Sequence, residues 1–222
     1  QFKLRYECHN GVDPSSDDVK QRLSRAELIP DHVQRALAKE GVALCFYNGQ
    51  PTDLPENAHL KNVPVQGDYT DPRFIPAHGP YGITIQTLLT TPTWNHIRLF
   101  HSQDSRKIYI GINGIFYTGS TATDLPHEQG HAADYLFDAP LSDSDAFQKL
   151  NHAHTTRTIR PGQERSARRE QFADWFAAYY VNASALHPDV RTYFAGIDTR
   201  IHILDVQDAD IGIIAQALWD DK

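Results

Sequence analysis

The chain has 222 residues, of which 40% are hydrophobic and 22% are charged, and its formal net charge is -7 at pH 7. This length suffices for one domain with a sizeable hydrophobic core, and no apolar run is long enough to span a bilayer. The net charge is acidic, and the chain has no overall excess of Lys and Arg, on which nucleic-acid binding depends. We therefore expect a soluble globular domain that neither spans a membrane nor binds nucleic acid.

The N-terminal half predicts two helices and a small sheet. Residues 1–16 carry turn formers and are expected to form a peripheral arm on a domain that spans residues 17–222. Capping residues and helical spacing predict one helix that starts near Asp17 and is interrupted at Pro30, and a second over residues 31–39. Short apolar runs predict strands at residues 42–47, 97–100 and 107–112.

The stretch from residue 51 to residue 80 is rich in proline and is expected to be a long connection that lines a cleft. Pro126 lies in the first turn of a central helix that is predicted to run to about Phe137. Further helices are expected at residues 142–152, 164–182 and 209–219. Early strands and late helices predict an α+β fold, with a small N-terminal sheet and a helical C-terminal half.

Two cysteines, Cys8 and Cys45, are too few for a disulfide scaffold or a cysteine zinc cluster. One disulfide between them and a free Cys45 buried in an apolar strand are equally compatible with the sequence. The chain starts at Gln1 and contains no methionine, so we expect an initiator and a targeting segment outside it. Secretion or export is the corresponding expectation.

The central helix carries the segment His127-Glu128-Gln129-Gly130-His131. Histidines four residues apart lie on one helix face, one turn apart, so both imidazoles can reach one metal ion. Glu128 adjoins the first histidine, which is the position of the general base in zinc-peptidase motifs. The alternative interpretation is a pair of structural histidines on an amphipathic helix.

A second helix favours the metal site, because Glu170 and Asp174 also lie four residues apart on one face. Glu170 supplies a third ligand and leaves a fourth position open, as in catalytic zinc sites. Asp174 is placed to accept a hydrogen bond from a ligand histidine. Asp134 is a further candidate, either to orient a ligand or to replace Glu170 as the third one. Without the upstream motif, a solvated helix face would be the favoured interpretation.

Two blocks, His127–Tyr135 and Glu170–Phe176, resemble the catalytic domain of anthrax toxin lethal factor and the lethal-factor-like metallopeptidases, which include Pro-Pro endopeptidases. The resemblance covers these blocks well and most of the remaining chain loosely. It implies a zincin-type fold, endopeptidase activity, and one zinc ion per chain held by His127, His131 and Glu170.

One position departs from this family, whose members carry a tyrosine seven residues before the glutamate ligand to stabilise the tetrahedral intermediate. Gln163 occupies that position here, and its amide is one candidate donor to the oxyanion. Arg165, Tyr117 and Tyr179 are the other candidates for this role or for substrate contact.

The sequence therefore predicts a zinc-dependent endopeptidase in which Glu128 is the general base for an activated water molecule. We expect a peptide or protein substrate to lie extended beside an edge strand, at residues 107–112 or 115–117. Two alternatives remain: a catalytically degenerate binding module on the same fold, and a zinc hydrolase of a non-peptide amide. The intact Glu128 argues against the binding module, which has no need of a base.

Overall fold

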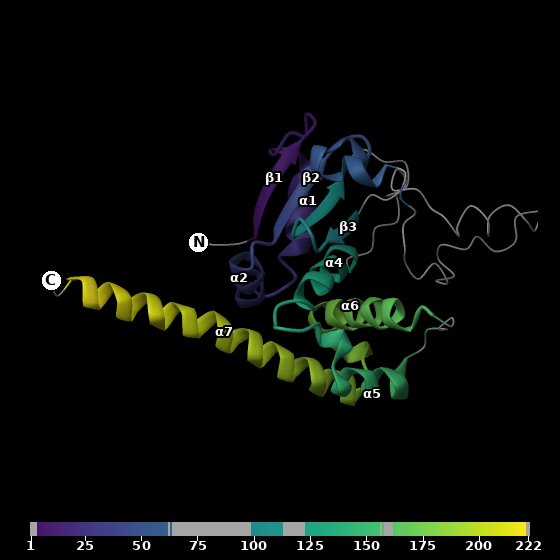
Figure 1. Cartoon of the computed structure of the whole chain (residues 1–222), viewed down its shortest axis with the longest axis vertical. Helices are drawn as coiled ribbons and strands as arrows, with labels where there is room; N and C mark the ends of the chain where they lie inside the picture. The colour runs from purple at the N-terminus through teal and green to yellow at the C-terminus, as the bar shows by residue number, and fades with distance from the viewer. Residues whose placement is uncertain are drawn as a thin grey trace, which may run out of the picture.

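The structure is a computed structural model that describes residues 4–61, 63, 99–112, 123–155, 157 and 162–220, with side chains as far as Val206. A small sheet and its helices form one half, and the later helices form the other, so the fold is α+β as predicted (Figure 1). The strands are β1 (Arg5–His9), β2 (Ala43–Tyr47), β3 (Leu99–Ser102) and β4 (Lys107–Gly111). The helices are α1 (Asp17–Ala26), α2 (Asp31–Lys39), α4 (Asp124–Ala133), α5 (Asp145–His154), α6 (Glu164–Asn182) and α7 (Pro188–Asp220), with short 3-10 turns η1 (Pro51–Asp53), η2 (Pro55–Leu60), η4 (Leu141–Asp143) and η5 (Ala183–Ala185).

The four strands are ordered β1-β2-β4-β3, with β1, β2 and β4 parallel and β3 antiparallel to β4. β1 pairs with β2 from Arg5 opposite Ala43 to His9 opposite Tyr47. Residues 5–9 therefore belong to the sheet, which corrects the predicted peripheral arm over residues 1–16. β1 is an edge strand that is held by backbone pairing more than by side-chain burial. Its sequence therefore has no apolar run.

All five residues of β2 are buried, since both faces of the sheet are covered. One face, with Leu44 and Phe46, belongs to a core that includes residues of α1, α2, α4, α6 and α7. The other face, with Cys45 and Tyr47, packs against Leu54 from the segment between η1 and η2. This two-sided burial explains the continuous apolar sequence of the strand.

The strand over residues 107–112 is β4, an interior strand between β2 and β3. It has no free edge, so the prediction that a peptide pairs with it is wrong. β3 is the edge strand on this side, and it lies next to α4. The alternative segment at residues 115–117, like most of the proline-rich stretch, lies outside the described residues.

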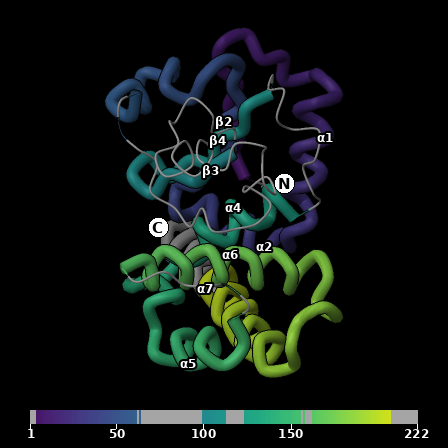
Figure 2. Tube along the Cα trace, turned by 90° about the vertical axis from the view of Figure 1, so that its right-hand side faces the viewer, coloured from purple at the N-terminus to yellow at the C-terminus, as the bar shows by residue number. Residues whose placement is uncertain are grey.

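α6 lies between the sheet half and α5, as Figure 2 shows. Its buried side chains Phe172 and Phe176 make aromatic contacts with Phe147 of α5 and Phe194 of α7. α7 begins at Pro188, far earlier than the predicted residue 209, and runs past α2 to Asp220 (Figure 1). None of the described helices combines the length and apolar character needed to cross a membrane.

Cys8 and Cys45 are both free. Cys8 pairs with Phe46 and Cys45 pairs with Glu7, so the two cysteines stand on opposite faces of the sheet. Side chains that alternate in this way point apart, which excludes a disulfide in this fold.

Candidate metal centre

A close approach of α4 and α6 builds the site. A Cβ atom on Gly130 would lie 2.9 Å from the Cα of Ala173 and 3.1 Å from both the carbonyl oxygen of Ala173 and a ring carbon of Phe176. Only glycine leaves room for this contact without displacement of a neighbour. The contact places Glu170, less than one turn before Ala173, against the histidine-bearing face of α4.

Three donor side chains converge at this crossing. His127 Nε2 lies 3.3 Å from one carboxylate oxygen of Glu170, and His131 Nε2 lies 3.4 Å from the other. The two imidazole rings are nearly perpendicular, with centroids 4.7 Å apart. Each of the three side chains is between 18 and 30% exposed, so the group is open to solvent on one side.

These separations match those of a metal centre better than those of an ion pair. Charge-assisted N–H···O hydrogen bonds are normally about 2.7–2.9 Å long. Tetrahedral zinc with bonds of about 2.0–2.1 Å sets its ligand atoms about 3.3 Å from one another. Two imidazoles and one carboxylate are also the donor set of open catalytic zinc sites, so His127, His131 and Glu170 fit a zinc ion.

Asp174 lies on the far side of His127 from Glu170. Its Oδ1 is 2.8 Å from His127 Nδ1, and its Oδ2 accepts a hydrogen bond from Arg157. A hydrogen bond at Nδ1 fixes the imidazole tautomer and directs the Nε2 lone pair at the metal position. No sequence motif marks Arg157, and its role depends on the tertiary contact with Asp174.

Charges within the group shift its pKa values. Burial alone would raise the pKa of Glu170, but the imidazoles of His131 and His127 hold it well below its usual value. Burial would lower the pKa of His127, but Asp174 and Glu170 raise it well above the usual value. The raised pKa of His127 reflects a negative field at its imidazole, which is also a field that attracts a cation.

Glu128 lies beside this group and is tied to the edge strand. Its Oε2 accepts a 2.8 Å hydrogen bond from the backbone N–H of His101 in β3. Burial raises the pKa of Glu128, which makes it a stronger base than a solvated carboxylate. Burial, assisted by the charge of His131, also lowers the pKa of His101 to about 3, so that imidazole is neutral. His101 has no motif around it and could not be identified from the sequence.

The other predicted residues lie elsewhere. Asp134 caps the C-terminus of α4, and its two oxygens accept 2.6 Å hydrogen bonds from the backbone and hydroxyl of Ser142. It joins α4 to η4 and is not part of the donor group. Arg165 pairs with Asp143 at 2.7 Å and is largely exposed.

The remaining oxyanion candidates differ in their distance from Glu170 along α6. Tyr179 is nine residues farther along, about 13 Å at the rise of an α-helix, and packs against Tyr180 and Phe194. Gln163 is the N-cap residue, two turns before Glu170 and on the same helix face. Tyr117 lies outside the described residues.

No family model matches the chain, and neither does any curated protein. Among solved structures, the chain is similar to the Pro-Pro endopeptidase PPEP-2 from Paenibacillus alvei. The two share 20% sequence identity with a TM-score of 0.54, and the match covers 91% of this chain and 96% of that chain. At this identity the likeness shows a shared fold, and it extends over nearly the whole length of both proteins.

Proposed function

We propose that this protein is a zinc-dependent endopeptidase of the zincin type. The observation that carries the proposal is the convergence of His127, His131 and Glu170 at ligand spacings, beside Glu128. The fold shared with a Pro-Pro endopeptidase supports the peptidase assignment over unrelated metal-dependent hydrolases. The likeness to lethal-factor-like enzymes in the two motif blocks points in the same direction.

Zinc held by the three ligands supplies Lewis-acid chemistry, which lets a water molecule lose its proton near neutral pH. Glu128 accepts that proton and returns it to the leaving amine when the peptide bond breaks. The His101 N–H holds one oxygen of Glu128 in place, and burial raises the pKa of this carboxylate above its usual value. Asp174 keeps Nε2 of His127 available to the metal.

β3 is the strand that we propose to bind the substrate. Among the described strands it is the edge of the sheet on the side of α4, and its backbone already contacts the proposed general base through His101. An extended peptide that adds to this edge would lie alongside the donor group, with its backbone paired and its side chains alternating. The Gln163 amide, on the same face of α6 as Glu170, is the candidate donor to the oxyanion.

A comparison of wild type with Glu128→Gln and Glu170→Ala tests the assignment. Wild type is expected to bind zinc and to cut peptides in a quenched library that includes Pro-Pro sequences. Glu128→Gln should keep the metal and lose about 10²-fold or more of the activity, since general-base catalysis contributes on this scale. Glu170→Ala should lose the metal itself.

Two outcomes would replace the proposal. Zinc bound by wild type without cleavage of any peptide, but with cleavage of a non-peptide amide, would favour the alternative hydrolase. No zinc bound even when supplied in excess, together with binding of a partner protein, would favour the binding module. A Glu128→Gln protein with full chelator-sensitive activity would refute the role given to the base.

A further inference from the structure

Within the described residues, two groups besides the proposed catalytic centre bring at least three metal-ligating atoms within 4.8 Å of one another. The first is His154, His187 and Asp189, at the surface. Its two imidazoles are stacked at 25° with centroids 4.0 Å apart, so their lone pairs cannot both point at one ion without ring rotation. The second group is Glu7, His9 and Cys45, which has a more suitable arrangement.

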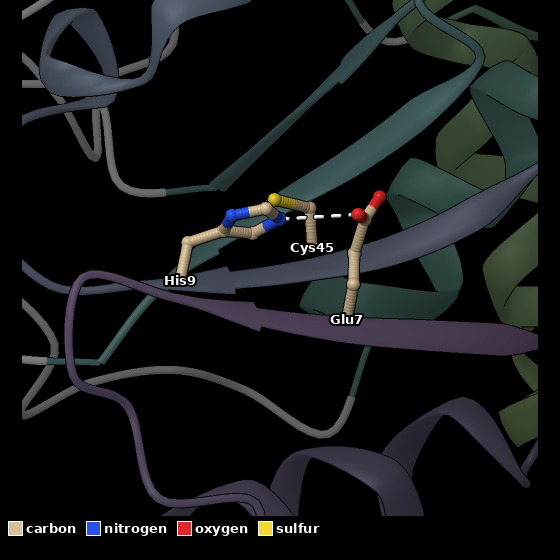
Figure 3. A group of neighbouring side chains, drawn as sticks. All are labelled: Glu7, His9 and Cys45. Carbon is tan, nitrogen blue, oxygen red and sulfur yellow. Dashed lines mark hydrogen bonds and ion pairs between the residues drawn. The ribbon is translucent and has the colours of Figure 1, made fainter.

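Strand pairing creates this second group. Glu7 and His9 are two residues apart on β1, so their side chains project from the same face of the sheet. Cys45 lies opposite Glu7 on β2 and shares that face. Figure 3 shows the three side chains together, with the His9 ring next to the Cys45 sulfur. Cys8, between the two ligands in sequence, points to the other face.

The donors differ in chemistry and exposure. His9 Nε2 lies 3.1 Å from Glu7 Oε2, and these two side chains are 33 and 37% exposed. The Cys45 thiol beneath them is fully buried. The exposed donors can adjust to close on an ion, while the sulfur stays fixed by the sheet. Thiolate, imidazole and carboxylate are all ligands of zinc.

The surrounding charges are balanced. Lys107 of β4 pairs with Glu7 Oε1 at 2.8 Å and with Glu56 Oε1 at 3.0 Å. A divalent cation together with the Cys45 thiolate and the Glu7 carboxylate has no net charge, so it adds no repulsion toward Lys107. Burial raises the pKa of the Cys45 thiol, and the Lys107 ammonium opposes part of that rise.

We propose that Glu7, His9 and Cys45 form a second zinc site, which fastens the edge strand β1 to β2. On binding, the Cys45 S–H bond loses its proton to solvent and a sulfur–zinc bond forms. The His9–Glu7 hydrogen bond is replaced by two metal bonds, and solvent supplies the fourth position. The metal would link residues 7 and 9 of β1, a strand held mainly by backbone pairing, to residue 45 of β2.

The metal-free thiol is protonated at neutral pH, since burial raises the pKa of Cys45 to about 12. Zinc must therefore displace the proton, and the affinity of this site should rise with pH. The buried thiol is also a poor nucleophile. This argues against a Cys–His catalytic pair built from the same residues.

Cobalt substitution of the full chain tests the site independently of any peptidase activity. A thiolate bound to Co²⁺ gives a strong near-ultraviolet charge-transfer band, whereas the two-His, one-Glu centre has no sulfur and cannot give one. Wild type should show the band, and Cys8→Ser, which alters the opposite face, should keep it. Cys45→Ser and His9→Ala should either lose the band or need at least about tenfold more cobalt to produce it.

Zinc content separates this proposal from the catalytic one. Wild type is expected to hold about two zinc ions per chain, and Cys45→Ser and Glu170→Ala about one each. Circular dichroism establishes that each variant is folded, and Glu7→Gln replaces any variant that is not. No thiolate band from folded wild type at saturating cobalt, or a band that Cys45→Ser retains, would overturn the second site and leave the peptidase proposal standing.

Discussion

Gly130→Ala should damage the proposed metal centre although the residue is not one of the candidate ligands. Its Cβ would sit 2.9 Å from Ala173 Cα, where non-bonded carbon atoms normally stay about 3.5–4.0 Å apart. The obstructing atoms include the backbone of α6, which cannot rotate away as a side chain can. The helices must therefore separate by roughly 0.5–1 Å, as follows from these carbon contact distances.

The separation of the two helices should weaken the function of the site more than it lowers the free energy of unfolding. Overpacking costs about 1–3 kcal/mol, and the gain in helix propensity from Gly to Ala returns about 1 kcal/mol, so the net loss is at most about 2 kcal/mol. Glu170 moves with α6 and leaves the spacing of 3.3–3.4 Å to the imidazoles. A misplacement of about 1 Å is enough to reduce catalysis by about 10²-fold.

Zinc affinity by competition with a chromophoric chelator, together with thermal unfolding, checks this prediction. Gly130→Ala should bind zinc at least about tenfold more weakly, the scale on which disturbed ligand support acts. Gly196→Ala in α7 is the matched control, because nothing lies within 4 Å of its added Cβ. The control should gain about 0.5–1 kcal/mol of stability and leave zinc binding unchanged. Equal zinc affinity in both variants would refute the argument that Gly130 sets the site.

Three further predictions concern the same molecule. Asp174→Asn should weaken zinc binding by about 10–100-fold in the same competition assay. Asp134→Asn should keep the metal and lose about 1–3 kcal/mol of unfolding free energy. Equal zinc loss in both variants would contradict the roles assigned to these residues. Chelation should abolish peptide cleavage with little change in far-ultraviolet circular dichroism, since Gly130 of α4 packs against Ala173 and Phe176 of α6 without the metal. Collapse of the spectrum would show that the metal supports the fold. Arg35 lowers the pKa of Asp205, so this carboxylate stabilises the fold above its unfolded pKa of about 3.9 and the contribution is lost as pH falls through the lower folded value. Denaturant titrations at neutral and acidic pH should therefore show a smaller pH difference in Asp205→Asn, and an unchanged difference would rule out this linkage.

The elements that the sequence located accurately are those with local signals at both ends. α2 runs from Asp31 to Lys39 as predicted, between Pro30 and Gly41, whose φ of 81° suits glycine. α4 ends at Ala133, short of the predicted Phe137, because the next residue turns to bind Ser142. That contact is tertiary, and no helix propensity encodes it.

The missed features all depend on distant partners. β1 is too short and polar to predict as a strand, and its pairing with β2 is what places it in the sheet. α7 starts early and also contacts α2. There, Arg35 donates hydrogen bonds from two side-chain nitrogens to the mostly buried Asp205. The interior position of β4 follows from strand order, which periodicity within one strand cannot reveal.

The proximity of the candidate donor residues follows from the same local spacing in both helices. His127 and His131 are one turn apart on α4, and Glu170 and Asp174 are one turn apart on α6. The crossing at Gly130 sets these turns side by side, so that Glu170 meets Nε2 of His127 and Asp174 meets its Nδ1. A slip of one residue in either helix would rotate its pair by about 100° and break every one of these contacts. The motif therefore supplies two of the candidate ligands, and the glycine inside it permits the packing that brings Glu170 to them.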